Sequence, residues 1–151
     1  MNPCSKCGEK TVWFALCPRC SIEPSKPAPV AVLPDDSAAR KGIPLTTGCL
    51  DYFPLALAAV AAVSKAGNDK HNPGQELHHA RGKSMDHADC IGRHLVDRGT
   101  FYEEKLPDGR VIRIRHSAGM AWRALALLQE EIERDEGAPL PRGAKPAEVK
   151  P

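Results

Sequence analysis

The stretch that decides the fold is DYFPLALAAVAAVSKA, residues Asp51–Ala66. Pro54 falls in the first turn of the expected helix, where a missing backbone N–H breaks no hydrogen bond. Alanine, leucine and valine then continue without a polar break as far as Ser64, so the helix is apolar on nearly every side. We therefore expect a buried central helix, which Gly67 and Asn68 end.

The sequence that follows predicts two more helices with a β-hairpin between them. Ser84 can cap a helix that runs to Asp97. Residues 101–115 predict a hairpin, with Ile112 and Ile114 on one face, about the turn Pro107-Asp108-Gly109. Ser117–Asp135 predicts a long last helix. The body, residues 38–136, is therefore expected to be mainly α, a small helical bundle with a short hairpin.

Apolar spacing predicts which sides of the two later helices pack. The predicted packing stripe of the second helix is Met85, Ala88, Ile91, Gly92 and Leu95, and that of the last helix is Ala118, Ala121, Trp122, Leu125, Leu128 and Ile132. We expect Glu130, Glu131, Glu133 and Glu136 to form a solvated face, and His87 to be a surface residue.

A zinc ribbon is predicted ahead of this body, over residues 1–22. Two C-x-x-C pairs, Cys4 with Cys7 and Cys17 with Cys20, have the spacing of a tetrahedral structural zinc site. Disulfides or redox motifs are the alternative for the same pairs. A proline-rich linker, residues 23–37, follows the ribbon, and residues 137–151 are expected to form a disordered tail.

Composition limits the function classes. The chain has 151 residues and a formal net charge of +2, which is too small to indicate nucleic acid by itself. Nucleic-acid binding through the ribbon is only weakly indicated. No stretch is long and apolar enough to cross a bilayer. The first residues lack a signal-peptide pattern, so we expect a cytoplasmic protein.

The candidate chemistry lies between His71 and His116, which enclose all six histidines. Asp86 and Asp89, three residues apart on one expected helix face, suit Mg²⁺. The residues expected to contact substrate or metal near this pair are His71, Asn72, Arg81, Lys83, Arg93, His94 and His116.

Two alternatives stay open for this region. Asp86, Asp89 and Arg93 also fit an ordinary row of surface ion pairs. The triplet His87-Ala88-Asp89 suggests an HD-type phosphohydrolase, but supporting histidines at the right places are not evident.

Several motifs together resemble a known domain. They are Ile43-Pro44-Leu45, Gly48-Cys49-Leu50-Asp51-Tyr52-Phe53-Pro54, Gly67-Asn68, His71-Asn72-Pro73-Gly74, Arg93-His94-Leu95 and Ala121–Gln129. In order and spacing this set resembles the phage and prophage domain named dATP/dGTP diphosphohydrolase, N-terminal, from about residue 40 to residue 133.

The resemblance implies a fold akin to the all-α, MazG-like nucleoside triphosphate pyrophosphohydrolases. Those enzymes cut a nucleoside triphosphate to monophosphate and pyrophosphate with Mg²⁺ held by helix carboxylates. Carried over to this chain, the resemblance implies that Asp86, Asp89, His94 and His116 are catalytic. Glu103, Glu104 and Asp108 are further carboxylate candidates. The E-x-x-E form typical of that group occurs once, at Glu130–Glu133, at the end of the last helix.

The leading hypothesis is thus a Mg²⁺- or Mn²⁺-dependent hydrolase of dATP and dGTP in phage nucleotide metabolism, with structural zinc in an accessory ribbon. If the chain is phage-encoded, the compartment is the host cytoplasm. The alternative is a non-catalytic binding module for nucleic acid or protein, in which the ribbon binds and the helical body is a scaffold. An apolar helix such as 51–66 also suggests a homo-oligomer, which would bury it fully.

Overall fold

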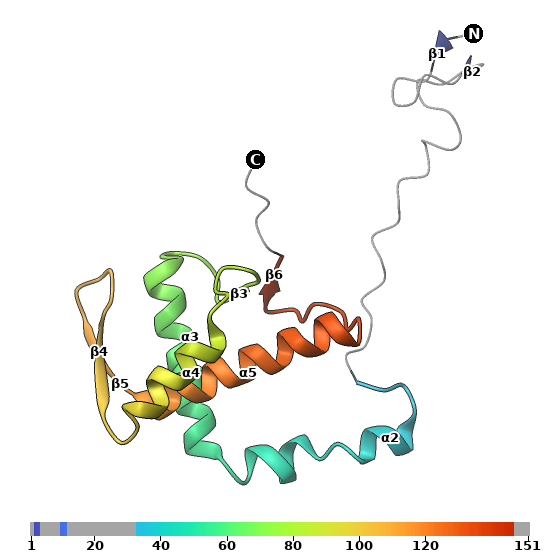
Figure 1. Ribbon diagram of the computed structural model, residues 1–151. Coiled ribbons are helices and arrows are strands. Elements are labelled where there is room, and N and C mark those ends of the chain that lie inside the picture. Colours follow the sequence, from blue (N-terminus) through green and yellow to red (C-terminus); the bar gives the residue numbers. More distant parts are fainter. Residues whose placement is uncertain (1, 4–9, 12–32, 147–151) are drawn as a thin grey trace. The chain divides into compact units, whose positions relative to one another are not determined.

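The computed structural model describes residues 2–3, 10–11 and 33–146 (Figure 1). The chain divides into two units, residues 1–31 and 32–151. In the first unit β1 (Asn2–Pro3) pairs antiparallel with β2 (Lys10–Thr11). The predicted zinc ligands Cys4, Cys7, Cys17 and Cys20 lie outside the described residues, so the zinc ribbon stays a prediction.

The second unit is mainly α, as predicted. Its helices are α2 (Ser37–Lys41), the π-helical turn η1 (Thr46–Leu50), α3 (Pro54–His71), α4 (His87–Val96) and α5 (His116–Asp135). Its strands form two pairs, β3 (His79–Ala80) parallel with β6 (Ala144–Lys145), and β4 (Phe101–Lys105) antiparallel with β5 (Val111–Arg115). Helix α4 lies along the first half of α5, and α3 crosses α5 (Figure 1).

Helix α3 differs from the buried central helix that the sequence predicts. It continues through Gly67 and Asn68 to His71, and the side chain of Asn68 is engaged in a hydrogen bond to the carbonyl of Gln75 instead of ending the helix. Its first turns are exposed, and Leu55 keeps 84% of its surface accessible. Every residue from 34 to 56 is exposed, so the apolar run is buried only toward its end, at Ala66. The homo-oligomer stays a prediction.

The hairpin β4–β5 is confirmed and supplies the small core. Gly109 has φ 85°, which a turn after Asp108 requires and which glycine adopts without strain. Ile114 is buried and Ile112 half-buried, whereas Arg113 and Arg115 are exposed, so the predicted two faces are correct. Ile114, Leu106 and Ala66 form the buried cluster, and β4–β5 therefore packs on the end of α3.

The predicted packing stripe of α4 is correct only at Ile91. Met85 precedes the helix and is 87% exposed, and Leu95 is 47% exposed. The inward face carries His87 and His94 instead, seven residues and so two turns apart, with Ile91 between them. His87 is only 4% exposed, so the prediction of a surface residue is also wrong.

The packing of α5 follows the prediction in part. Ala118 is buried, but Leu125 and Leu128 are about half exposed, at 50% and 53%. Glu130 and Glu133 are half-buried and contact other elements, so they are not a solvated face. The reason is that α5 packs through small residues, chiefly Ala118, Gly119 and Ala126, which leave room for polar side chains.

The segment after α5 contains strand β6. Ala144 and Lys145 pair with His79 and Ala80, so regular structure occurs at these two residues of the predicted tail, 137–151; its disorder elsewhere stays a prediction. Among the described helices, no single one has the length and hydropathy to cross a bilayer. Only Ser37–Leu50 and Pro54–His71 taken together, with an 89° bend between them, meet those two criteria.

Gly119 sets the approach of α4 to α5. A Cβ atom at this position would lie 2.9 Å from both Cε1 and Nε2 of His94. We expect Gly119→Ala to lower the free energy of unfolding by about 1–3 kcal/mol, because the ring and the backbone must shift. Denaturant unfolding measures this change.

Gly92→Ala is the matched control, since a Cβ at Gly92 meets no atom within 4 Å. Helix propensity alone should make that variant more stable, by about 0.5–1 kcal/mol. Equal effects of the two substitutions would contradict the close approach of the helices at Gly119.

Candidate functional site

A cavity of about 420 Å³ lies where the end of α3, the loop 78–84, α4, β4–β5 and α5 meet. Its volume is in the range of small-molecule sites in proteins. Four of the predicted substrate or catalytic residues line it: His71, Asn72, Lys83 and His94. His78, His79 and Arg123 are further polar residues of the wall.

Asn68 shapes the wall of this cavity on the side of α3. The residue is 5% exposed, and its Nδ2 atom donates to the carbonyl of Gln75 at 3.1 Å. Its Oδ1 atom lies 3.4 Å from both Asn72 Nδ2 and the backbone N of His78, which donate to it. One buried amide therefore fixes the turn that presents His71, Asn72 and His78 to the cavity.

The cavity is positively charged. Lys70, Lys83 and Arg123 line it, against a single carboxylate, Glu104. Lys70 is paired with Glu104 at 2.8 Å, whereas Lys83 only donates to Asn72 Oδ1 at 3.2 Å. Arg123 donates to Ser84 Oγ at 2.6 Å. Two cations without a carboxylate partner in the described residues suit an anionic ligand such as a phosphate.

Two imidazoles meet beside the cavity. His94 Nδ1 and His116 Nδ1 are 3.1 Å apart, so one donates to the other. Tyr102 packs on both rings, with centroid distances of 5.7 and 5.0 Å. Burial, followed by the charge of His116, lowers the pKa of His94. His94 is therefore neutral near pH 7 and able to accept a proton.

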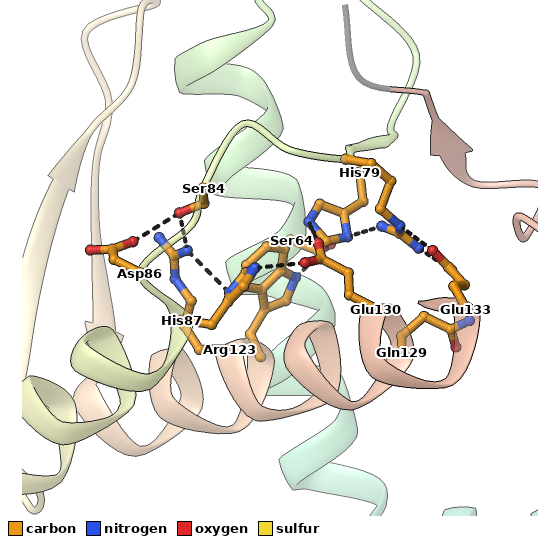
Figure 2. A network of polar contacts seen from close by, with 11 residues as sticks. Ser64, His79, Ser84, Asp86, His87, Arg123, Gln129, Glu130 and Glu133 are labelled. Carbon is orange, nitrogen blue, oxygen red and sulfur yellow. Dashed lines mark hydrogen bonds and ion pairs between the residues drawn. The ribbon is translucent and has the colours of Figure 1, made fainter. Parts of the chain in front are cut away.

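A second group of donors adjoins the cavity through His79. His79 lies on the loop, His87 on α4 and Glu130 on α5, and one ligand atom from each lies within 4.8 Å of the other two. Glu130 Oε1 is 3.7 Å from His79 Nε2, and Glu130 Oε2 is 3.5 Å from His87 Nε2. Figure 2 shows the carboxylate of Glu130 between the two imidazole rings. We call these three residues the His-His-Glu cluster.

Arg81 fixes the loop that carries His79. Its Nε and NH2 atoms donate to Glu133 Oε2 and Oε1, both at 2.7 Å, and its NH1 contacts His79 Nδ1. Both side chains of the ion pair are only 11% exposed. The hydrogen bonds from Arg81 lower the pKa of Glu133, so this carboxylate is charged and neutralises Arg81.

Neither aspartate of the predicted pair, Asp86 and Asp89, lines the cavity, although Asp86 accepts a hydrogen bond from Ser84 Oγ of its wall at 3.1 Å. Asp86 precedes α4, accepts from Arg93 NH2 at 2.8 Å, and is half exposed. That hydrogen bond lowers the pKa of Asp86. Neither aspartate belongs to the three-residue donor group found among the described residues, and Asp108 pairs with Arg110 at the hairpin turn.

Sequence reasoning missed His87 and Glu130 as site residues. The signal was present in the helical spacing: His87 and His94 are seven residues apart on α4, and Trp122, Ala126, Glu130 and Glu133 recur three or four apart on α5. Apolar spacing alone does not reveal these two series of residues, because the buried sides of α4 and α5 carry polar residues.

Comparison with known proteins identifies no relative: no protein-family model, no curated protein and no solved structure matches this chain.

The ion pair of Arg81 and Glu133 should contribute to stability because its side chains are largely buried and joined by two hydrogen bonds. We expect Arg81→Ala to lower the free energy of unfolding by about 1–3 kcal/mol, since it leaves a carboxylate without its partner. Denaturant unfolding is the measurement. Arg134→Ala, which breaks an exposed pair with Asp135, is the control and should change the free energy of unfolding little. A similar loss of stability in both variants would refute the contribution of the ion pair between Arg81 and Glu133.

The lowered pKa of His94 predicts how stability depends on pH. In the unfolded chain His94 is protonated as the pH falls through about 6.5, whereas in the folded chain it is protonated only at lower pH. The neutral imidazole therefore makes its full contribution to the free energy of unfolding above pH 6.5. It is lost as the pH falls toward the lower, folded pKa. Unfolding free energies between pH 5 and pH 8 should fall on acidification in the wild type, and less steeply in His94→Gln. An unchanged slope in that variant would show that another group is responsible.

Proposed function

We propose that this chain is a metal-dependent hydrolase of purine deoxynucleoside triphosphates, which it cuts to the monophosphate and pyrophosphate. The proposal rests on two independent grounds. One is the motif resemblance over residues 40–133, which implies the substrate class and a fold like that of the all-α pyrophosphohydrolases. The other is the cavity and the residues that line it.

The observation that carries the proposal is that cationic side chains lie beside residues that could bind a metal ion. Lys83 and Arg123 line the same cavity as His79, which belongs to the His-His-Glu cluster. A triphosphate needs cationic groups for its oxygens and a divalent ion for the charge that develops during hydrolysis. This cavity offers the residues for both.

We assign the phosphate contacts to Lys83 and Arg123, since neither is held by a carboxylate in the described residues. Asn72 orients Lys83, and Ser84 orients Arg123, through the hydrogen bonds given above. A bound divalent ion would neutralise phosphate charge and lower the pKa of the attacking water.

In the proposed reaction the oxygen of water forms a bond to the α-phosphorus. The bond from this phosphorus to the bridging oxygen breaks, and pyrophosphate leaves with the electron pair. We assign the acceptance of the proton from the water to the neutral imidazole of His94, which lines the cavity.

The ribbon is an accessory part of this proposal. Cys4, Cys7, Cys17 and Cys20 would hold one structural zinc, which leaves no open position for chemistry. Its expected effect is on the folding of residues 1–22 and not on turnover.

The test is pyrophosphate release from each of the four dNTPs by the full chain with Mn²⁺ or Mg²⁺. We expect turnover of dATP or dGTP. Lys83→Ala should lower kcat/KM roughly 10-fold or more, because it removes one charge-assisted contact to phosphate. Lys65→Ala is the control, since Lys65 lies on α3 but does not line the cavity and pairs with Asp69.

A folded, metal-loaded chain that releases no pyrophosphate from any dNTP would overturn the proposal. The binding-module alternative would then be favoured. Equal losses in the Lys83 and Lys65 variants would refute the assignment of phosphate binding to this cavity.

A further inference from the structure

Two buried polar atoms of the His-His-Glu cluster have no hydrogen-bond partner. They are Nε2 of His87, whose residue is 4% exposed, and Oε1 of Glu130. Leaving buried donors or acceptors unsatisfied costs about 1–3 kcal/mol each, so such atoms need an explanation. Both atoms belong to the same group of three residues.

The spacing of the cluster fits an ion better than direct hydrogen bonds. The carboxylate lies 3.7 Å from His79 Nε2 and 3.5 Å from His87 Nε2, longer than ordinary N–H···O bonds. An ion about 2.1 Å from each ligand separates tetrahedral or octahedral ligand atoms by about 3.0–3.4 Å. Small side-chain adjustments would therefore close the cluster around one ion.

We propose that His79, His87 and Glu130 bind one divalent first-row transition-metal ion. Two imidazoles and one carboxylate suit Mn²⁺, Fe²⁺, Co²⁺ or Zn²⁺ and leave coordination positions open for water or substrate. Mg²⁺ prefers oxygen ligands, so the cluster selects against the ion that Asp86 and Asp89 would favour.

The neighbours of the cluster set the conditions for metal binding. Arg81 is neutralised by Glu133, so its positive charge is compensated beside the site. A neutral imidazole that binds metal through Nε2 carries its proton on Nδ1. Metal binding therefore requires Arg81 NH1 to give up its contact with His79 Nδ1, and Arg123 NH1 its 3.5 Å contact with His87 Nδ1. The two bonds to Glu133 can hold the guanidinium during that change. Trp122 packs against the ring of His79 at 5.1 Å and limits its rotation.

A role for this ion in nucleotide hydrolysis rests on the proposed function, but binding of the ion does not. The two can fail separately, because metal binding is measured without nucleotide.

The experiment counts ions per chain in the full-length protein after loading with Zn²⁺ or Co²⁺ and gel filtration. We expect the wild type to retain one ion more than Glu130→Gln and His79→Gln, whatever number the cysteines hold. Titration calorimetry should show at least about 100-fold weaker binding at this site in both variants. An excess of Mg²⁺ should not displace the ion.

Two controls make the result specific. Glu131→Gln changes the adjacent residue on α5 in the same way, and the double variant Asp86→Asn/Asp89→Asn removes the predicted carboxylate pair. Both should keep the full ion count, and circular dichroism should show every variant folded. The same count in wild type and cluster variants, or a loss in the aspartate variant alone, would overturn the proposal.

Discussion

The packing of α4 on α5 is the contact on which the rest of the described body depends. It is made by small residues of α5 against imidazoles of α4, and at Gly119 the ring of His94 takes the place that a side chain would fill. This arrangement brings His87 opposite Glu130 and His94 opposite His116. A helix pair packed through leucines would bury more apolar surface but would hold no polar groups at the contact.

Because the polar contact of α4 with α5 buries little apolar surface, other interactions must supply part of the stability of the body. The buried apolar core is small, with Ala66, Leu106 and Ile114 at the junction of α3 with the hairpin. Side-chain hydrogen bonds supply part of the stabilisation, such as those from Asn68 to the loop that follows α3 and from Arg81 to Glu133. These hydrogen bonds also fix the loop 72–84, so the groups that stabilise the body also position the cavity wall.

The sequence predicts the elements of this fold better than their orientation. The hairpin is predicted by the turn at Gly109, and the last helix by helical spacing of its apolar residues. Both signals are local in the sequence. The inward side of α4 could not be predicted by hydropathy, because histidines occupy it. Helix α3 continues beyond Gly67, where the sequence predicts its end, because tertiary contacts override the weak local preference of these residues. For the site, His71, Asn72, Lys83 and His94 were found by clustering, whereas the pairing of His87 with Glu130 joins residues far apart in the chain.

The measurement that tests the central claim most directly is an anomalous-scattering crystal structure of the full chain loaded with Co²⁺ or Zn²⁺ and a non-hydrolysable dATP analogue. The account predicts an anomalous peak about 2.0–2.2 Å from His79, His87 and Glu130, with the triphosphate in the adjoining cavity between Lys83 and Arg123. A peak at Asp86 and Asp89, or an ion at the cysteines alone with the cavity empty, would contradict it.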